Sequence, residues 1–362
     1  MGFKRWAAAL AVAGLTTFAS FTVFASSATA QEVIRLRIAS GHPSVNTYVN
    51  LMQNFFVPEV TKRVAARTKY KIEFIEGYGG SMVKVAETLE GVQSGIIDIG
   101  GYCFCFEPSN LPLHAFQVML PFGTMDAVDS VRIARRVYDA VPFMSEVFEK
   151  KFRQKLIGLI ADNGYNIGTN FEWNNVSDLK GQKIAGAGLN LKWLEFAGAV
   201  PVQTSLPEVY TSLQTGVYNG IILFPSAMVN FKLNEVSKYY TEIGFGAITW
   251  HGLTINTARF NRLPKEVQDI IVEVGREYEA QTGIVNKENY AKQLAAFAAV
   301  GGIVRKVPDT VRQDWAKSMS PWPAQKAKEL DGLGLPGSQV LELTLKAAEE
   351  LGYKWPVRYQ VK

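Results

Sequence analysis

Two cysteines and three histidines carry the most distinctive chemistry in this sequence. Cys103 and Cys105 are separated by one residue, and a bridge between them would close a strained ring. Side chains two apart on a strand also share one face, so we expect both cysteines to be free thiols. Metal binding would need further ligands, and none of His42, His114 and His251 lies at zinc-ligand spacing. The sequence therefore predicts no metal site.

Short motifs that accompany common catalytic chemistry are missing. The sequence has no Gly-x-x-x-x-Gly-Lys phosphate loop, no Gly-x-Ser-x-Gly elbow and no His-Glu-x-x-His zinc motif. Gly186-x-Gly188 lacks the third glycine of a dinucleotide fingerprint. The net charge of +5 is mild, and no lysine or arginine cluster indicates a nucleic-acid partner. We expect no catalytic residues and no cofactor, and an exported enzyme remains as an alternative.

The stretch from Asp178 to Phe224 indicates the fold class. Its short apolar runs, separated by turn residues and one helical pattern, predict alternating strands and helices. Pro207 suits the first turn of a helix and Gly216 its left-handed end, with Val209, Leu213 and Val217 on one helical face. The run 221–224 predicts a strand buried on both faces, as in a parallel sheet. The fold class is therefore α/β.

A second set of elements lies nearer the N-terminus. Strands are predicted at 34–39, 71–75 and 96–100, with helices at about 47–67 and 84–93 between them. A β-α-β-α-β order predicts a parallel sheet covered by helices. A helical stretch at about 127–153 follows, and strands at 156–160 and 246–255 connect the two sets. A crevice is expected at the carboxyl ends of the strands, where open α/β sheets bind ligands.

The first thirty residues read as an export signal. Lys4 and Arg5 precede an apolar run, and Ala28-Thr29-Ala30 offers the small residues of a cleavage site. We expect cleavage after Ala30 and a soluble periplasmic protein beginning at Gln31. A retained transmembrane helix is the alternative for this segment, and no later segment is long enough to span a bilayer.

Several segments together resemble one family. They are Asp178-Leu179-Lys180-Gly181-x-Lys183-Ile184, the strand from Gly198 to Val202, and the helix Glu208-Val209-Tyr210 to Gly216-Val217. Further matches lie at 90–98, 120–122, 163–165 and 263–268. In order and spacing, these segments resemble the solute-binding proteins of TRAP transporters, the tripartite ATP-independent periplasmic carriers, in their dicarboxylate-type (DctP-like) family. The resemblance covers about residues 35–315.

The resemblance implies a two-domain periplasmic binding protein, each domain a mostly parallel sheet with flanking helices. It assigns 1–30 to the signal peptide, 31–154 plus 246–275 to domain I, and 155–245 plus 276–362 to domain II and a C-terminal helical segment. The helical pattern that begins at Pro264 and extends toward Phe297 would be a long helix spanning both domains. A small organic acid would bind in the interdomain cleft by hinge closure, and the partners would be the TRAP membrane permease subunits.

Three positions depart from the family pattern. The family usually has an arginine that clamps the ligand carboxylate two residues after the second lysine of Asp-Leu-Lys-Gly-x-Lys, and here that position is Ala185. A second arginine often follows Asn-Gly-x, where this chain has Asn166. The family's Gln-Glu-Asn-Pro after the last strand is Ile222-Leu223-Phe224-Pro225 here. The usual carboxylate clamp is therefore absent from these positions.

Other residues are candidates to replace the clamp. Lys84 falls where family members place a ligand-facing residue, although a solvated lysine at a helix start is the alternative. The aromatic residues Tyr102, Phe104, Trp193, Phe224 and Trp250 could line the cleft or belong to the core, and His42 could face the cleft or cap a turn. The complete set of ligand-binding candidates is Lys84, Tyr102, Cys103, Asn166, Ala185, Leu206, Phe224 and Trp250.

These substitutions also suggest the class of ligand. A charge-assisted hydrogen bond contributes about 1.5–3 kcal/mol, so a short dicarboxylate should bind poorly without the arginines. Burial of a large apolar group contributes roughly as much, which favours an aromatic or apolar monocarboxylate whose acid group meets Lys84, Asn166 and backbone amides. A neutral or zwitterionic solute is the second possibility. A binding protein of an ABC importer or a sensor remains an alternative function.

Overall fold

One mixed sheet organises the chain. The computed structural model describes residues 32–361, so the expected signal peptide lies outside the described residues. The strands follow the order β2-β1-β3-β8-β4-β7-β5-β6, with β9 paired to β8. Their bounds are β1 Glu32–Ala39, β2 Tyr70–Gly77, β3 Ile99–Cys103, β4 Gln154–Thr169, β5 Lys183–Gly186, β6 Val200–Gln203, β7 Gly220–Leu223, β8 Tyr239–Asn256 and β9 Ile303–Lys306.

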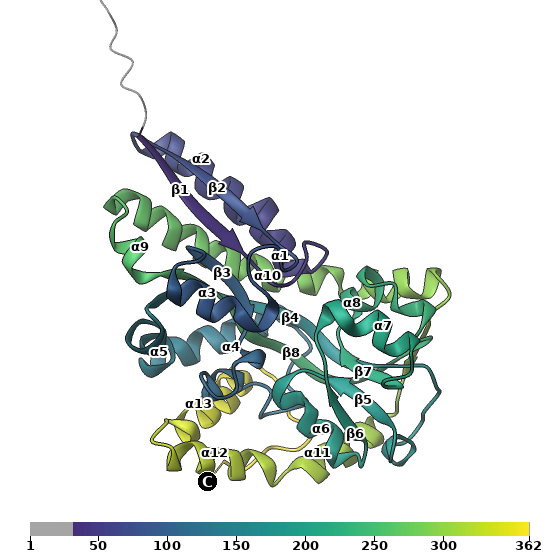
Figure 1. Ribbon diagram of the computed structural model, residues 1–362. Coiled ribbons are helices and arrows are strands. Elements are labelled where there is room, and N and C mark those ends of the chain that lie inside the picture. The colour runs from purple at the N-terminus through teal and green to yellow at the C-terminus, as the bar shows by residue number, and fades with distance from the viewer. Residues whose placement is uncertain (1–31, 362) are drawn as a thin grey trace, which may run out of the picture. The chain divides into compact units, whose positions relative to one another are not determined.

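Two long antiparallel strands join two parallel groups. Strand β1 pairs in parallel with β2 and β3, which together form the first strand set, and β5 pairs in parallel with β6 and β7, the second strand set. Strands β4 and β8, of 16 and 18 residues, pair with each other and carry one set at each end. Both are almost wholly buried, because helices and loops cover both faces. The predicted α/β class with crossing strands is confirmed (Figure 1).

The pairing of β4 with β8 is irregular near its middle. The register shifts between Ile160 and Ala161 and again between Ala161 and Gly164, so Asp162 and Asn163 have no partner in the ladder. Such bulges re-aim side chains and are common beside functional sites. The bulge places Asp162 in the pocket described below, whereas Asn163 donates from Nδ2 to the carbonyl of Asn286 at 2.8 Å.

Helices flank the sheet on both sides. The α-helices are α1 Thr47–Leu51, α2 Val57–Arg67, α3 Thr88–Ser94, α4 Ala127–Ala140, α5 Phe143–Phe152, α6 Leu191–Phe196, α7 Val209–Gln214, α8 Pro225–Asn230, α9 Thr257–Asn261, α10 Lys265–Ala299, α11 Asp309–Met319, α12 Trp322–Gly332 and α13 Gly337–Glu350. A π-helical turn, η1 Met52–Phe56, joins α1 to α2, so the helix predicted at 47–67 is one continuous element. The helical stretch predicted at 127–153 is interrupted at Pro142, which has no amide proton for a helical hydrogen bond.

Short 3₁₀ turns lie at several strand ends. They are η2 Val85–Glu87, η3 Phe104–Phe106, η4 Pro112–Ala115, η5 Val176–Leu179, η6 Gly188–Asn190, η7 Leu206–Glu208 and η8 Leu233–Glu235. Pro207 lies in the first turn of η7, and Gly216 has the left-handed φ of 72° that the sequence predicts. Val217 does not share the buried face of Val209 and Leu213, because α7 ends at Gln214 and leaves Val217 half exposed.

Helix α10 is the longest helix of the described chain. It packs on β4 and contacts helices beside both strand sets, including α2 and α8, as the resemblance implies (Figure 1). Gly275 and Gly158 allow this close approach, because a Cβ on Gly275 would lie 2.3 Å from the carbonyl oxygen of Ile157. Buried Glu279 joins the same surfaces by accepting from the Leu159 amide at 2.8 Å and from Arg135.

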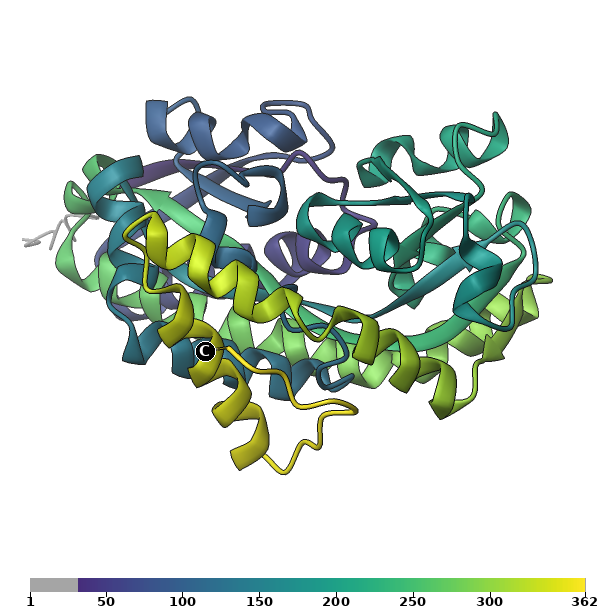
Figure 2. The same cartoon turned by 90° about the horizontal axis from the view of Figure 1, so that it is seen from below.

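The C-terminal helices complete the arrangement. In Figure 2 the yellow helices α11–α13 lie across the front, while the blue elements of the first strand set and the teal elements of the second occupy opposite sides. No helix of residues 32–361 is long and apolar enough to cross a membrane. The domain boundaries stay a prediction.

Candidate functional site

A pocket opens where the carboxyl ends of both strand sets meet. The loops after β1 and β3 contribute one wall, β4 and β8 the floor, and the segments around β5, β6 and β7 the opposite wall. Its empty space is about 490 Å³, including the open mouth. The lining residues are His42, Asn46, Cys103, Cys105, Phe106, Asp162, Tyr165, Gly186, Ala187, Asn190, Thr204, Ser205, Leu206, Val209, Ile221, Ile222, Leu223, Phe224, Trp250 and His251. The pocket therefore occupies the expected crevice.

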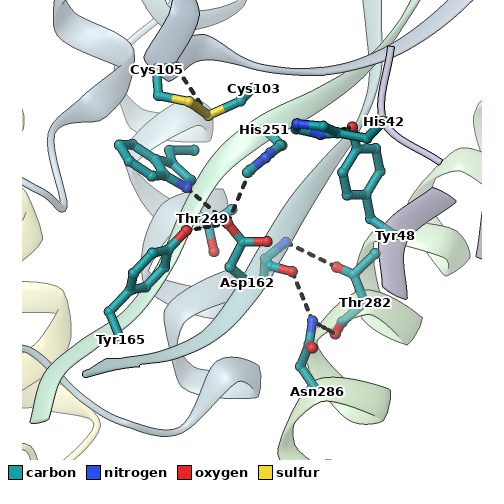
Figure 3. A network of polar contacts seen from close by, with 12 residues as sticks. His42, Tyr48, Cys103, Cys105, Asp162, Tyr165, Thr249, His251, Thr282 and Asn286 are labelled. Carbon is teal, nitrogen blue, oxygen red and sulfur yellow. Dashed lines mark hydrogen bonds and ion pairs between the residues drawn. A yellow bond between two sulfur atoms is a disulfide. The ribbon is translucent and has the colours of Figure 1, made fainter. Parts of the chain in front are cut away.

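Asp162 is the only carboxylic acid among these residues. Its Oδ2 accepts hydrogen bonds from the Tyr165 hydroxyl at 2.7 Å and from Trp250 Nε1 at 2.9 Å (Figure 3). Burial raises the pKa of Asp162 to about 6, although both hydrogen bonds act in the opposite direction by stabilising the carboxylate. A carboxyl group poised near neutral pH inside a pocket is typical of a functional site.

Two histidines lie near this carboxyl group. His251 Nδ1 lies 3.4 Å from Asp162 Oδ2, and the His42 ring approaches from the loop after β1, with Nδ1 2.9 Å from the Tyr48 hydroxyl (Figure 3). Burial lowers the pKa of each imidazole to about 3, so both are neutral at pH 7. His42 Nε2 and His251 Nδ1 are buried without a hydrogen-bond partner among the described residues. Unsatisfied buried groups of this kind are rare and require an explanation.

The pocket has no permanent positive charge, since its lining includes no lysine and no arginine. A ligand carboxylate 4 Å from ionised Asp162 would be repelled by about 4 kcal/mol at an effective dielectric constant of roughly 20. An acid therefore cannot be held in this pocket by the forked arginine contacts that the family usually makes from the positions of Ala185 and Asn166.

The cysteines differ from expectation. Cys103 and Cys105 form a disulfide, so the prediction of free thiols is wrong. On one extended strand both side chains would share a face, but β3 ends at Cys103 and the chain turns into η3. The turn brings the two Cα atoms to 5.1 Å, which is within disulfide range.

The disulfide loop contacts the opposite wall at Gly188. A Cβ on this glycine would lie 2.6 Å from the carbonyl oxygen of Cys105, and the backbone has a φ of +60°. Only glycine tolerates both conditions. The loop after β3 and the loop after β5 are therefore in backbone contact beside the pocket.

The second strand set supplies the apolar half of the pocket. Leu206 and Val209 come from the start of η7 and α7, and the residues 221–224 come from β7 and its end. Phe224 packs edge-on against Tyr165 with ring centroids 5.3 Å apart, and Tyr165 packs in the same way against Trp250 at 5.9 Å. Aromatic edges and aliphatic groups suit the flat apolar body of a small ligand.

Half of the ligand-binding candidates lie in this pocket. Cys103, Leu206, Phe224 and Trp250 line it, whereas Lys84, Tyr102, Asn166 and Ala185 do not. The His42 ring also faces it. Lys84 is exposed, with Nζ 3.3 Å from the Gly80 carbonyl oxygen, and Tyr102 is buried and donates to Gln154 Oε1 at 2.9 Å.

Asn166 and Ala185 have other surroundings. Asn166 Oδ1 accepts from the amides of Ile243 and Gly244, and its Nδ2 donates to the hydroxyl groups of Tyr240 and Tyr290. It lines a second cavity, because consecutive strand residues face opposite sides of a sheet and Tyr165 takes the pocket side. Ala185 is fully buried in the core, as are the aromatic candidates Phe104 and Trp193.

Asp162, Tyr165 and His251 were not anticipated from the sequence. Asp162 interrupts the buried apolar strand β4, and an acid at such a position is rarely present without a partner or a function. That signal was available in the sequence. The approach of His251 was not, because it depends on the register between β4 and β8.

Comparison with known proteins gives consistent results. A sequence profile described as bacterial extracellular solute-binding protein, family 7 (DctP), matches residues 47–329. A solute-binding protein of Albidiferax ferrireducens is 29% identical over 141 residues, which span 38% of this chain and only 42% of that relative.

Solved structures share the fold. The TRAP solute-binding protein of Rhodoferax ferrireducens in complex with copurified benzoate superposes with a TM-score of 0.78 at 18% identity, covering 88% of this chain and 98% of that one. A TRAP periplasmic solute-binding protein of Bordetella bronchiseptica with bound (R)- and (S)-mandelate has a TM-score of 0.76 at 22% identity, covering 88% and 99%.

Proposed function

Because the chain belongs to bacterial extracellular solute-binding protein family 7, the DctP-like receptors of TRAP transporters, we propose that it is the extracytoplasmic receptor of a TRAP importer. It captures a small organic acid and delivers it to the membrane permease subunits. The observation that carries this proposal is the pocket at the carboxyl ends of both strand sets. With the signal peptide expected at 1–30, the receptor works in the periplasm.

The ligand that fits this pocket best is an aromatic or otherwise apolar monocarboxylate. Its body would contact the apolar half around Leu206, Val209 and Phe224. Burial of such a body contributes roughly 1.5–3 kcal/mol. The relatives with bound benzoate and mandelate share the fold and bind acids of this shape, which supports the same class here.

The acid group would lie at the polar floor beside Asp162. His42 Nε2 has no hydrogen-bond partner in the described part of the chain and, in a neutral imidazole, can donate or accept. Thr204 and Ser205 on the opposite wall offer hydroxyl groups. Lys84 and Asn166, the two side chains assigned to the acid from the sequence, lie outside the lining, so this set replaces them in the proposal.

Capture would involve closure of the two strand sets about β4 and β8. Two contacts support this motion: Gly188 against the disulfide loop, and a hydrogen bond of 2.6 Å from Asn230 Nδ2 to the Val45 carbonyl oxygen. Each joins a loop of the first strand set to a segment of the second. Ligand bridging the walls would favour the closed state by its higher affinity for that state.

Thermal-shift measurements test the receptor function. A panel of benzoate, mandelate, succinate, malate, galacturonate and neutral solutes should show the largest rise in Tm with benzoate or mandelate. A ligand at 100 times its Kd adds about 2.7 kcal/mol of stability, which gives a clear shift. Small-angle scattering at saturation should show a smaller radius of gyration.

Three outcomes would contradict parts of this proposal. No shift with any solute would reject the receptor function itself. The largest shift with succinate or malate would reject the apolar monocarboxylate, and an unchanged radius of gyration would reject closure. Recovery of the ligand unchanged after prolonged incubation distinguishes a receptor from an exported enzyme on the same architecture.

A further inference from the structure

The charges that face the pocket are unusual for a site that takes an acid. Its lining combines one carboxyl group with two neutral imidazoles, and no lysine or arginine is present to balance a second negative charge. The titratable side chains around the carboxyl group of Asp162 come from four segments. Strand β4 carries Asp162 itself and Tyr165, and β8 carries His251. The loop after β1 carries His42, and Tyr48 on α1 lies behind His42. Cys103, at the end of β3, and Cys105, in η3, are bridged and do not titrate.

The geometry leaves positions for a proton but offers no charged donor to balance a bare anion. Asp162 Oδ2 already accepts from Tyr165 and Trp250, and His251 Nδ1 lies 3.4 Å away without a hydrogen bond of its own. His42 Nε2 is likewise buried and has no hydrogen-bond partner within residues 32–361. Two carboxylates that share a site cannot both ionise easily, so one pKa of the pair rises and a proton stays between them.

We infer that this receptor binds its organic acid together with one proton taken from solvent, held among the ligand carboxyl group, Asp162 and His251. This inference rests on the proposed receptor function and specifies the form in which the acid binds. The only bond that forms is the O–H or N–H bond to the proton taken up from solvent, and no bond breaks in the protein or the ligand: one carboxylate anion and one proton enter, so binding adds no net charge to the site.

The pH dependence follows from linkage. Burial raises the pKa of Asp162 to about 6 in the empty receptor, and a nearby ligand carboxylate raises it further. Between pH 7 and 8.5 the complex therefore holds one proton more than the separated partners, and Kd increases about tenfold per pH unit. Well below pH 6 the empty receptor already carries the proton, so Kd becomes independent of pH until the ligand itself titrates.

Calorimetry of the unmodified receptor with benzoate tests this directly. Titrations at pH 7.5 in phosphate and in Tris give observed enthalpies that differ by the number of protons taken up times the difference between the ionisation enthalpies of the two buffers. We expect about one proton per benzoate, and the same for mandelate. Binding of benzoate with no proton uptake would overturn the inference and leave the receptor function intact.

Asp162→Asn removes the charge and keeps the shape. Proton uptake should fall toward zero, Kd for benzoate at pH 8 should improve at least tenfold, and the slope of Kd with pH should disappear. The matched control is Asp314→Asn, an exposed carboxyl group on α11 whose loss should leave one proton per ligand. If Asp162→Asn does not fold, the calorimetry of the unmodified receptor decides alone.

Two further ligands distinguish a failure of the proton inference from a failure of the receptor function. Benzamide has the shape of benzoic acid without the charge, and its Kd should not depend on pH. Tight binding of benzylammonium with no binding of benzoate would mean that Asp162 pairs with a cation, which overturns the inference while a solute receptor remains. Absence of binding by any acid, amide or amine would reject the receptor function and the inference with it.

Discussion

Position 188 has no room for a side-chain carbon. A Cβ there would meet the backbone of Cys105, and the left-handed φ adds strain of roughly 1 kcal/mol for any other residue. Gly188→Ala should therefore weaken benzoate binding by about tenfold or more, because the loops after β3 and β5 can no longer meet. Isothermal titration provides the measurement.

The matched control for this substitution is Gly216→Ala. Gly216 also has a positive φ, of 72°, but its Cβ would point into open space. It carries the same backbone strain without the contact, so it should lower stability while leaving the benzoate Kd unchanged. Equal losses of affinity in both variants would show that strain alone, and not loop contact, explains the effect.

The sequence predicts the roles of some single residues and not of others. The sequence shows Ala185 and Asn166 where the family usually has arginines, and it therefore predicts that the usual carboxylate clamp is absent from these two positions. The disulfide between the two cysteines could not be predicted from the sequence, because it depends on the strand ending at Cys103 rather than continuing. The face taken by Asn166 was equally hidden, since the bulge around Asp162 resets the alternation along β4.

At the level of elements, helix α10 and strand β4 approach through two glycines. A Cβ on Gly275 would lie 2.3 Å from the Ile157 carbonyl oxygen, so a shift of backbone is unavoidable. Overpacking typically destabilises by about 1–3 kcal/mol, and the gain in helix propensity from alanine is at most about 1 kcal/mol. Gly275→Ala should lower the free energy of unfolding by about 1–2 kcal/mol in urea denaturation.

The control for that element is the last residue of α12. Gly332→Ala introduces the same methyl group where nothing lies within 4 Å, so the free energy of unfolding should stay the same or rise by up to about 1 kcal/mol. A stable Gly275→Ala variant would mean that α10 can move away from β4 at little cost.

Long periodic elements were the easiest to predict. The pattern that begins at Pro264 and extends toward Phe297 became α10, Lys265–Ala299, because regular spacing over many turns leaves little ambiguity. The π-helical turn within 52–56 has no such signal, since one extra residue in a turn barely changes the apolar spacing. The pairing of β4 with β8 joins residues far apart in the chain, and local patterns carry no information about their register.

For the whole molecule, buried histidines determine how acid destabilises the fold. Burial lowers the pKa of His42 and His251 to about 3 and that of His114 to about 4, so unfolding exposes groups that take up protons below pH 6.5. Their stabilising effect is fully present above pH 6.5 and is lost as pH falls toward their folded values. Asp162 acts in the opposite sense, because its raised pKa favours the folded state as the acid forms.

The combined effect of these four groups on the free energy of unfolding can be measured. Near pH 5 the three histidines take up about three protons on unfolding and Asp162 releases about one, so these groups alone lower the free energy of unfolding by about 3 kcal/mol per pH unit of acidification. Urea denaturation between pH 4.5 and 6 should show at least this slope. A flat profile would show that the imidazoles are solvated in the folded state.

The bulged pair β4 and β8 has a consequence for the order of events during capture. Asp162 and His251 both lie on these two strands, which pass from one strand set to the other. In the proposed closure these two strands would act as the hinge, so the separation of Asp162 and His251 would stay the same while the two strand sets rotate. The site for the acid group would thus exist before the two strand sets close. The polar end of a solute could then bind first, and the second strand set could enclose its apolar body afterwards. Substitution of the residues in the second strand set that contact the apolar body could then change which acids bind, while β4 and β8 stay the same.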